Sequence, residues 1–246
     1  MPDSTLTIAL NSISKALSEQ DFLFIDAEQV LELLSDINGE PAGQDPLFLE
    51  SWNTLEQDQY MADGGSYRKR RHATYATWFA GESPRLMPHQ PHYQTVDYNH
   101  LNGGVARYFA PILGDLHQSR TLNALLELGA YFFGGLSGNA QWHIELHQFR
   151  IEARDGQRGK PTPEGVHRDG VDFVMVVMIN RVNINSGATT IYNLDHELIG
   201  EFTLKDSFDL VLVNDRKLYH GVTPIEQIDA SAEAYRDVLV ITFRQK

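Results

Sequence analysis

Short runs of apolar and β-branched residues, separated by loops that contain Gly, Pro, Asn or Asp, dominate the chain after Gly138. No helical period intervenes between these runs, which is typical of an antiparallel sandwich or barrel. The pattern therefore predicts a mainly β fold, a double-stranded β-helix or jelly roll, with flanking helices packed on its outside. The predicted strands cover residues 142–153, 171–182, 188–194, 207–213 and 237–243.

The first 135 residues have a different pattern of apolar and polar positions. Apolar residues recur at helical spacing over residues 8–34, interrupted by the run Phe-Leu-Phe-Ile at 22–25. This predicts helix, short strand and helix, with Asp26 as the N-cap of the second helix at 27–34. Gly and Pro predict that residues 38–60 are mostly loop.

Two further elements complete this half. Residues 64–79 predict a turn and then a strand rich in Thr, Tyr and Trp. Residues 123–133 predict a buried helix that ends at Gly134 and Gly135. We therefore expect a single domain over residues 1–246, in which residues 1–135 form a helical and mixed elaboration and residues 136–246 supply the core strands.

Composition narrows the class of protein. The chain has 20 Lys and Arg against 33 Asp and Glu, a formal charge of −13, which argues against binding nucleic acid. No run of about 18 apolar residues suggests a membrane span. The absence of cysteine excludes disulfides and thiolate ligands, so we expect a cytoplasmic protein whose metals are held by His and carboxylate. The sequence leaves the oligomeric state open, and a homo-oligomer is compatible with it.

Candidate metal ligands surround the motif Glu-Gly-Val-His-Arg-Asp-Gly at 164–170. His167 and Asp169 are two residues apart, so in a strand they would point to the same face. His220 follows the apolar strand at 207–213 and precedes Gly221. Two histidines and one carboxylate on one face are the ligands of non-haem Fe(II) oxygenases. A His-x-Asp pair alone arises by chance, and structural histidines are the plain alternative, but its position at the start of a strand favours the metal.

An iron(II) ion held by three protein ligands needs two further electrons from another molecule before it can activate O2. A chelating 2-oxo acid such as 2-oxoglutarate would supply them, and its distal carboxylate would need a buried Arg. Arg236 opens the last apolar strand and is the predicted anchor, with Arg244 at the end of that strand as the competitor.

The runs EGVHRDGVDF, NSGATTIYNLD, LVNDRKLYHGVTPI and RDVLVITF resemble the bacterial Fe(II)/2-oxoglutarate dioxygenases that hydroxylate free L-amino acids, the isoleucine hydroxylases among them. The resemblance covers most of residues 60–246 and implies hydroxylation or sulfoxidation of a small-molecule substrate, a free aliphatic L-amino acid, with release of succinate and CO2. It implies that His167, Asp169 and His220 bind iron and that Arg236 binds 2-oxoglutarate. Thr189 and Tyr192 would line the cosubstrate pocket, or simply pack a hairpin.

Substrate-binding candidates lie on two other predicted strands. Arg68 and Arg70 share one face of the basic run at 67–72, where an inward Arg would bind the substrate carboxylate; a solvated strand edge is the alternative. His147 and Gln148 are adjacent on the strand at 142–153, so only one of them can face the pocket.

Three rival functions remain at this point. The same chemistry could act on a peptide, a protein or another small molecule. A metal-binding cupin-like protein would need no 2-oxoglutarate, and therefore no Arg236. A protein that only binds or regulates would be expected to have lost a ligand, whereas all three ligand types are present.

Overall fold

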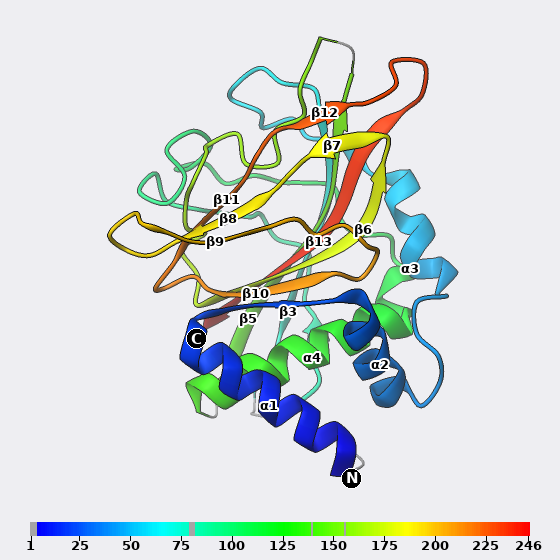
Figure 1. Cartoon of the computed structure of the whole chain (residues 1–246), viewed down its shortest axis with the longest axis vertical. Coiled ribbons are helices and arrows are strands. Elements are labelled where there is room, and N and C mark those ends of the chain that lie inside the picture. The colour runs from blue at the N-terminus through cyan, green and yellow to red at the C-terminus, as the bar shows by residue number, and fades with distance from the viewer. Residues whose placement is uncertain (1–3, 79–81, 139, 155) are drawn as a thin grey trace.

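One large antiparallel sheet organises the molecule. The computed structural model describes residues 4–78, 82–138, 140–154 and 156–246 (Figure 1). Its main sheet has eight strands in the order β1-β10-β6-β13-β5-β3-β2, with β4 paired to β3. These strands are β1 (Phe22–Ile25), β2 (Glu56–Gln57), β3 (Arg68–Ala76), β4 (Arg85–Leu86), β5 (Trp142–Ala153), β6 (Phe173–Val182), β10 (Leu210–Asn214) and β13 (Ala234–Gln245).

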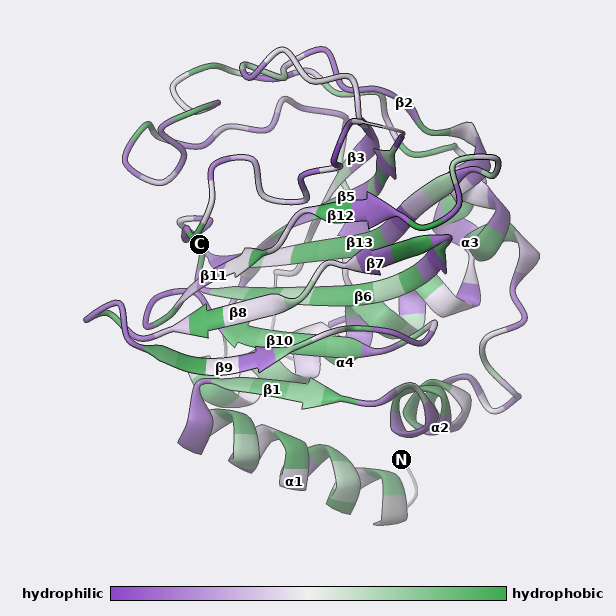
Figure 2. Cartoon of the chain, turned by 45° about the horizontal axis from the view of Figure 1, so that its top comes forward, coloured by the Kyte–Doolittle hydropathy of each residue, from purple (hydrophilic) through white to green (hydrophobic). Residues whose placement is uncertain are grey.

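Two smaller antiparallel sheets form the second layer, with orders β11-β8-β9 and β12-β7. Their strands are β7 (Ile184–Ser186), β8 (Thr189–Tyr192), β9 (Leu198–Phe202), β11 (Tyr219–Val222) and β12 (Ile225–Gln227). Figure 2 shows this layer facing the main sheet, with apolar strands β6, β10 and β13 between polar loops. The predicted jelly roll is confirmed.

Helices α1 (Ser4–Gln20), α2 (Ala27–Asn38) and α4 (Arg120–Ser137) lie together on the outer side of the main sheet (Figure 1). The predicted N-cap is confirmed, because the side chain of Asp26 accepts a hydrogen bond of 2.9 Å from the amide of Gln29. The short α3 (Pro46–Glu50) and the 3₁₀ turn η1 (Ser51–Thr54) lie between α2 and β2, and the 3₁₀ turn η2 (Leu116–Gln118) precedes α4. None of the helices in the described ranges is long and apolar enough to cross a membrane.

The two faces of the main sheet are distinct. Alternate residues such as Leu212, Leu239 and Phe243 join the buried core beneath the helices. The intervening residues, including Val211 and Val238, point the other way and line a cavity between the layers. Strand alternation thus gives the sheet one mostly apolar side and one side that can carry functional groups.

The structure corrects two sequence-based assignments. Helix α4 continues through Gly134 and Gly135 and ends at Ser137, because packing of its apolar face against the sheet outweighs the weak helix propensity of glycine. The stretch 38–60, predicted as mostly loop, contains α3, whose N-cap Asp45 precedes Pro46 at the first turn. Phe79, the end of the predicted run 64–79, lies outside the described residues. The first 135 residues also supply β1 to β4 of the main sheet.

Candidate metal centre and cavity

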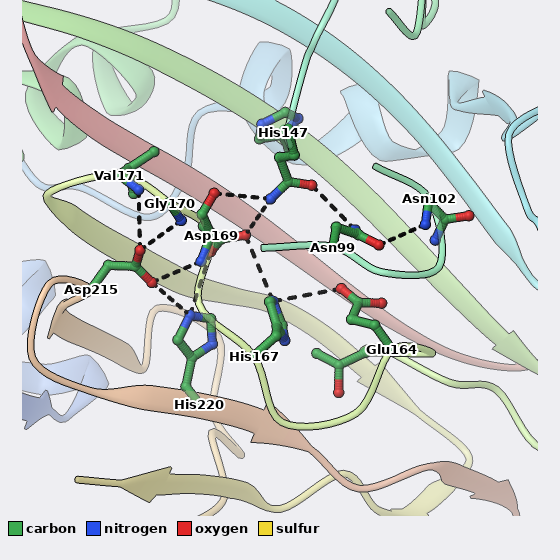
Figure 3. Close-up of polar contacts among 12 residues, drawn as sticks. Asn99, Asn102, His147, Glu164, His167, Asp169, Gly170, Val171, Asp215 and His220 are labelled. Carbon is green, nitrogen blue, oxygen red and sulfur yellow. Dashed lines mark hydrogen bonds and ion pairs between the residues drawn. The ribbon is translucent and has the colours of Figure 1, made fainter. Parts of the chain in front are cut away.

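The three predicted metal ligands meet at one point. Donor atoms of His167, Asp169 and His220 all lie within 4.8 Å of one another (Figure 3). The Nε2 atom of His167 is 3.7 Å from Oδ1 of Asp169, and Nε2 of His220 is 3.4 Å from Oδ2 of the same carboxylate. Two imidazoles and one carboxylate therefore surround a space suited to a divalent iron ion.

The backbone geometry differs from the one that predicted this meeting. His167 and Asp169 precede β6 and do not lie on a regular strand. His167 forms an isolated bridge with His220 of β11, through two backbone hydrogen bonds of 2.9 Å. The prediction that strand alternation aligns His167 with Asp169 is therefore wrong, because the alignment comes from this bridge and from the loop that follows it.

Both imidazoles present a free nitrogen to the centre. Nδ1 of His167 is 3.0 Å from the carbonyl oxygen of Gly165, which can only accept, so Nδ1 carries the hydrogen and Nε2 keeps its lone pair. Nε2 of His220 is buried and makes no hydrogen bond with any described group. Burial alone would lower the pKa of His220, but Asp169 and Asp215 outweigh it and raise the pKa to about 10. The donor set and the surrounding negative charge fit a bound cation.

Asp215 holds the loop that carries Asp169. Its buried carboxylate accepts hydrogen bonds of 2.9, 2.8 and 3.1 Å from the amides of Asp169, Gly170 and Val171 (Figure 3). Gly170 has a φ of +79°, and a Cβ there would lie 2.6 Å from the ring of Tyr98, so only glycine fits. The sequence analysis did not single out Asp215, because an aspartate in a turn after a strand carries no distinguishing signal.

A cavity of about 310 Å³ adjoins the centre, and two of the buried arginines that line it, Arg236 and Arg107, lack an ion pair with any described residue. Each of the two is 3% exposed. Burial lowers the pKa of Arg236 to about 9, which reflects a desolvated cation without a counter-ion. Arg244 also lines the cavity but is exposed. Of the two predicted anchors, Arg236 is thus the one whose charge is buried and unpaired.

The orientation of strand β5 shows which of the two substrate-binding candidates, His147 or Gln148, faces the cavity. His143, Glu145 and His147 line the cavity, whereas Gln148 lies on the opposite face. The amide of Gln148 donates a 2.7 Å hydrogen bond to the hydroxyl of Ser51, so the prediction that it binds substrate is wrong. Burial opposes ionisation of Glu145, but hydrogen bonds from the surrounding histidines lower its pKa, and the carboxylate stays charged.

The basic run on β3 is buried rather than a solvated edge. Arg68 and Arg70 line the cavity, as predicted for one face of the strand. Arg68 donates to Asp58 at 2.8 Å, and the Arg70 guanidinium packs over the rings of Phe109 and Phe149. These arginines are therefore already engaged by protein groups.

Strand β8 separates the two remaining candidates. Thr189 lines the cavity beside β11, whereas Tyr192 belongs to the opposite set of alternating residues and is absent from the described lining. The structure thus places only one of the two predicted cosubstrate residues at the cavity.

Three cavity residues were not among the predicted site residues. Nε2 of Gln94 lies 3.2 Å from Oδ1 of Asp169, and its Oε1 accepts a 2.9 Å hydrogen bond from Arg107. Oε1 of Glu164 lies 3.5 Å from Nε2 of His167, while its Oε2 is buried and makes no hydrogen bond within the described structure. Gln94 and Arg107 lie in irregular chain, where periodicity cannot assign a direction.

Comparison with known proteins identifies the family. The L-isoleucine-4-hydroxylase of Bacillus thuringiensis is 26% identical over 196 residues, which are 78% of this chain and 79% of that protein. The 3(1)-hydroxy-L-isoleucine 4-dioxygenase of Pantoea ananatis is 29% identical over 63% of this chain and 64% of its own length.

Among solved structures, a bsmA homologue from Methylobium petroleophilum PM1 is 34% identical with a TM-score of 0.82, covering 96% of this chain and 92% of that one. The structure of IDO from Bacillus thuringiensis shares the fold with a TM-score of 0.77 at 19% identity, covering 96% of this chain and 99% of that one. The family model for 2OG-Fe dioxygenases, which use Fe(II), 2-oxoglutarate and O2, matches residues 49–242. The chain belongs to the 2OG-Fe dioxygenase family.

Proposed function

We propose that this dioxygenase oxidises a free L-amino acid, with His167, Asp169 and His220 as the iron ligands. Bound Fe(II) together with 2-oxoglutarate supplies the oxidation that transfers one oxygen atom of O2 to the substrate and leaves succinate and CO2. An aliphatic carbon would be hydroxylated, and a thioether sulfur would become a sulfoxide. The protein positions 2-oxoglutarate and the substrate beside each other and excludes water from the space between them.

Arg236 is the proposed partner of the distal carboxylate of 2-oxoglutarate. Its guanidinium is buried on the cavity face of β13, and its Nε makes no hydrogen bond within the described structure. A carboxylate that binds there bidentately would restore the interactions lost on burial. Thr189, on the facing layer, lines the same cavity.

The observation that carries the amino-acid proposal is the second buried and unpaired cation, Arg107. One arginine suffices for 2-oxoglutarate, so Arg107 is available for a carboxylate of the substrate itself. The free Oε2 of Glu164, which also lines the cavity, is a suitable acceptor for the substrate ammonium group. A cavity of about 310 Å³ lies at the small end of the usual range for small-molecule sites, about 300–1,000 Å³, which suits small acids. The names of the two isoleucine-oxidising relatives support the same substrate class.

The test is succinate release by the Fe(II)-loaded protein, screened across free L-amino acids, N-acetylated amino acids and short peptides. We expect release above the substrate-free background with one or more free aliphatic or thioether amino acids. Their N-acetyl derivatives should be poor substrates, because they lack the ammonium group that Glu164 would bind.

Arg107→Met is the variant that tests the substrate site. It should raise the substrate KM by about 10- to 100-fold, because it removes a buried charge-assisted hydrogen bond, and leave the affinity for 2-oxoglutarate unchanged. Preference for peptides over free amino acids, or an unchanged KM in Arg107→Met, would contradict the proposed substrate class.

A further inference from the structure

A second cluster of histidines surrounds Glu145, away from the three proposed iron ligands. His72 of β3 lies opposite His147 of β5 in the strand register, and their rings stack with centroids 4.8 Å apart. Glu145 lies two residues before His147 on the same face, and His92 reaches the cluster from the segment after β4. One donor atom from each of the four residues lies within 4.8 Å of all the others.

The ring nitrogens of His72 are buried without a hydrogen-bond partner among the described residues. His72 itself is fully buried. Its Nε2 atom points at Oε2 of Glu145 from 3.5 Å, and Nε2 of His147 lies at the same distance from that oxygen. Nδ1 of His92 contacts the same oxygen. Three imidazole nitrogens thus converge on one carboxylate oxygen.

The spacing of His72 and Glu145 suits a shared metal ion, whereas His92 is hydrogen-bonded directly to the same carboxylate oxygen, a contact that a bound ion would replace. A tetrahedral zinc ion with bonds of about 2.0–2.1 Å holds its ligand atoms about 3.4 Å apart. The 3.5 Å between Nε2 of His72 and Oε2 of Glu145 is close to that value, and so are the 3.4 and 3.7 Å separations among His167, Asp169 and His220. The same donor types, imidazoles and a carboxylate, therefore lie together in two places within the described residues.

A contact with Arg70 shows that the imidazole of His147 does not act as a metal ligand. Nη2 of Arg70 lies 2.6 Å from Nδ1 of His147, and because a guanidinium only donates, Nδ1 must accept. In the neutral ring Nε2 then carries the hydrogen and faces Glu145, so His147 orients the carboxylate instead of binding the ion. Asp58, 3.7 Å from Nη1 of Arg70, offsets the nearby positive charge.

We propose that His72, His92 and Glu145 bind a second divalent metal ion, zinc, in a site separate from the iron centre. Two imidazoles and one carboxylate are ligands that zinc accepts in tetrahedral geometry. Three protein ligands leave a fourth position, and the side chains of His92 and Glu145 line the cavity, so that position is open to water or to a substrate atom.

Metal content of the full-length protein tests this site without relying on activity. The protein is stripped with a chelator, dialysed against Zn(II) and analysed by mass spectrometry of the metal. Wild type should hold two ions per chain, and Asp169→Ala/His220→Ala, which disables the iron centre, should hold one. Adding Glu145→Gln or His72→Phe to that double variant should remove the remaining ion. Adding His89→Ala, an exposed histidine whose ring lies 6.2 Å from that of His72, should not.

Cobalt gives an independent readout in the same double variant. Co(II) in a tetrahedral site absorbs intensely in the visible, and we expect that absorption with wild-type Glu145 and its loss with Glu145→Gln. Circular dichroism and thermal unfolding check that each variant is folded. If either Glu145→Gln or His72→Phe fails to fold, the other substitution still tests the site. A single zinc ion in wild type, no ion in the double variant, or an ion that survives both Glu145→Gln and His72→Phe would overturn the proposal.

Discussion

The two histidine–carboxylate clusters are built by different means. The ligands of the proposed iron centre come from an irregular loop and from β11 of the smaller layer, and they are aligned by a backbone bridge and by the buried carboxylate of Asp215. The cluster around Glu145 comes mainly from β3 and β5 of the main sheet, where strand register alone places His72 beside His147. One cluster depends on a positioned loop, and the other depends on a rigid sheet.

This difference predicts how each cluster responds to mutation. Substitutions that free the loop should weaken iron binding without touching β3 or β5. Substitutions of charged groups in the cavity should change the affinity for the small acids and leave both clusters in place. The four predictions below run from the largest expected effect to the smallest.

Arg236→Met should weaken 2-oxoglutarate binding by about 100- to 1,000-fold, because a buried carboxylate would lose the buried guanidinium that pairs with it. The matched variant Arg244→Met changes the same residue type on the same face of the same strand, but at an exposed position, and should change the affinity less than threefold. Anaerobic calorimetry of the Fe(II)-loaded protein measures both. A larger loss in Arg244→Met would transfer the anchor to that residue.

Asp215→Ala should lower Fe(II) affinity by about 10- to 100-fold, because three backbone amides around Asp169 lose their acceptor. Asp209 is a matched control, since its buried carboxylate also accepts from three amides, those of Ala27, Lys205 and Asp206, outside the cavity. Asp209→Ala should reduce thermal stability and leave Fe(II) affinity unchanged. Equal iron affinities in the two variants would remove the positioning role of Asp215.

The sequence predicted the jelly roll because long strands such as β5 and β13 are rich in apolar and β-branched residues. Such local residue preferences are enough to predict a strand. Residues 142–153 were predicted with the same bounds as β5. The sequence could not say which face of β5 is inward, because that depends on where the helices pack. For this reason His147 and Gln148 were both candidates until the main sheet was seen to bury Gln148 against Ser51.

The spacing argument for the triad is not supported by the structure, whereas the family resemblance that implied the same ligands is confirmed. The spacing of His167 and Asp169 resembled a strand pair, whereas their alignment depends on contacts with Asp215 and His220, more than 40 residues away. Arg107 could not be foreseen at all. Its direction is set by a backbone pairing with His92, within a long irregular segment that no periodic pattern describes.

Gln94→Leu should lower kcat/KM by about tenfold, because Gln94 joins Asp169 and Arg107, the proposed iron ligand and the proposed substrate partner. Its amide donates to Asp169, and its carbonyl oxygen accepts from Arg107, so its loss removes charge-assisted hydrogen bonds at both. The effect should fall mainly on the substrate KM, since Asp169 keeps its contacts with Asp215. Gln59→Leu, at an exposed position, serves as the control and should leave both constants unchanged.

Thr189→Val and Tyr192→Phe test the face assignment of β8 with the smallest expected effects. Thr189 lines the cavity, so loss of its hydroxyl should weaken 2-oxoglutarate binding by about two- to tenfold, the contribution of one neutral hydrogen bond. Tyr192 belongs to the opposite alternating set, and loss of its hydroxyl should change that affinity less than twofold. Each substitution removes one hydroxyl from the same short strand, so calorimetry compares them directly. A stronger effect of Tyr192→Phe would mean that β8 presents its other face to the cosubstrate, which would also turn Ile191 away from the cavity.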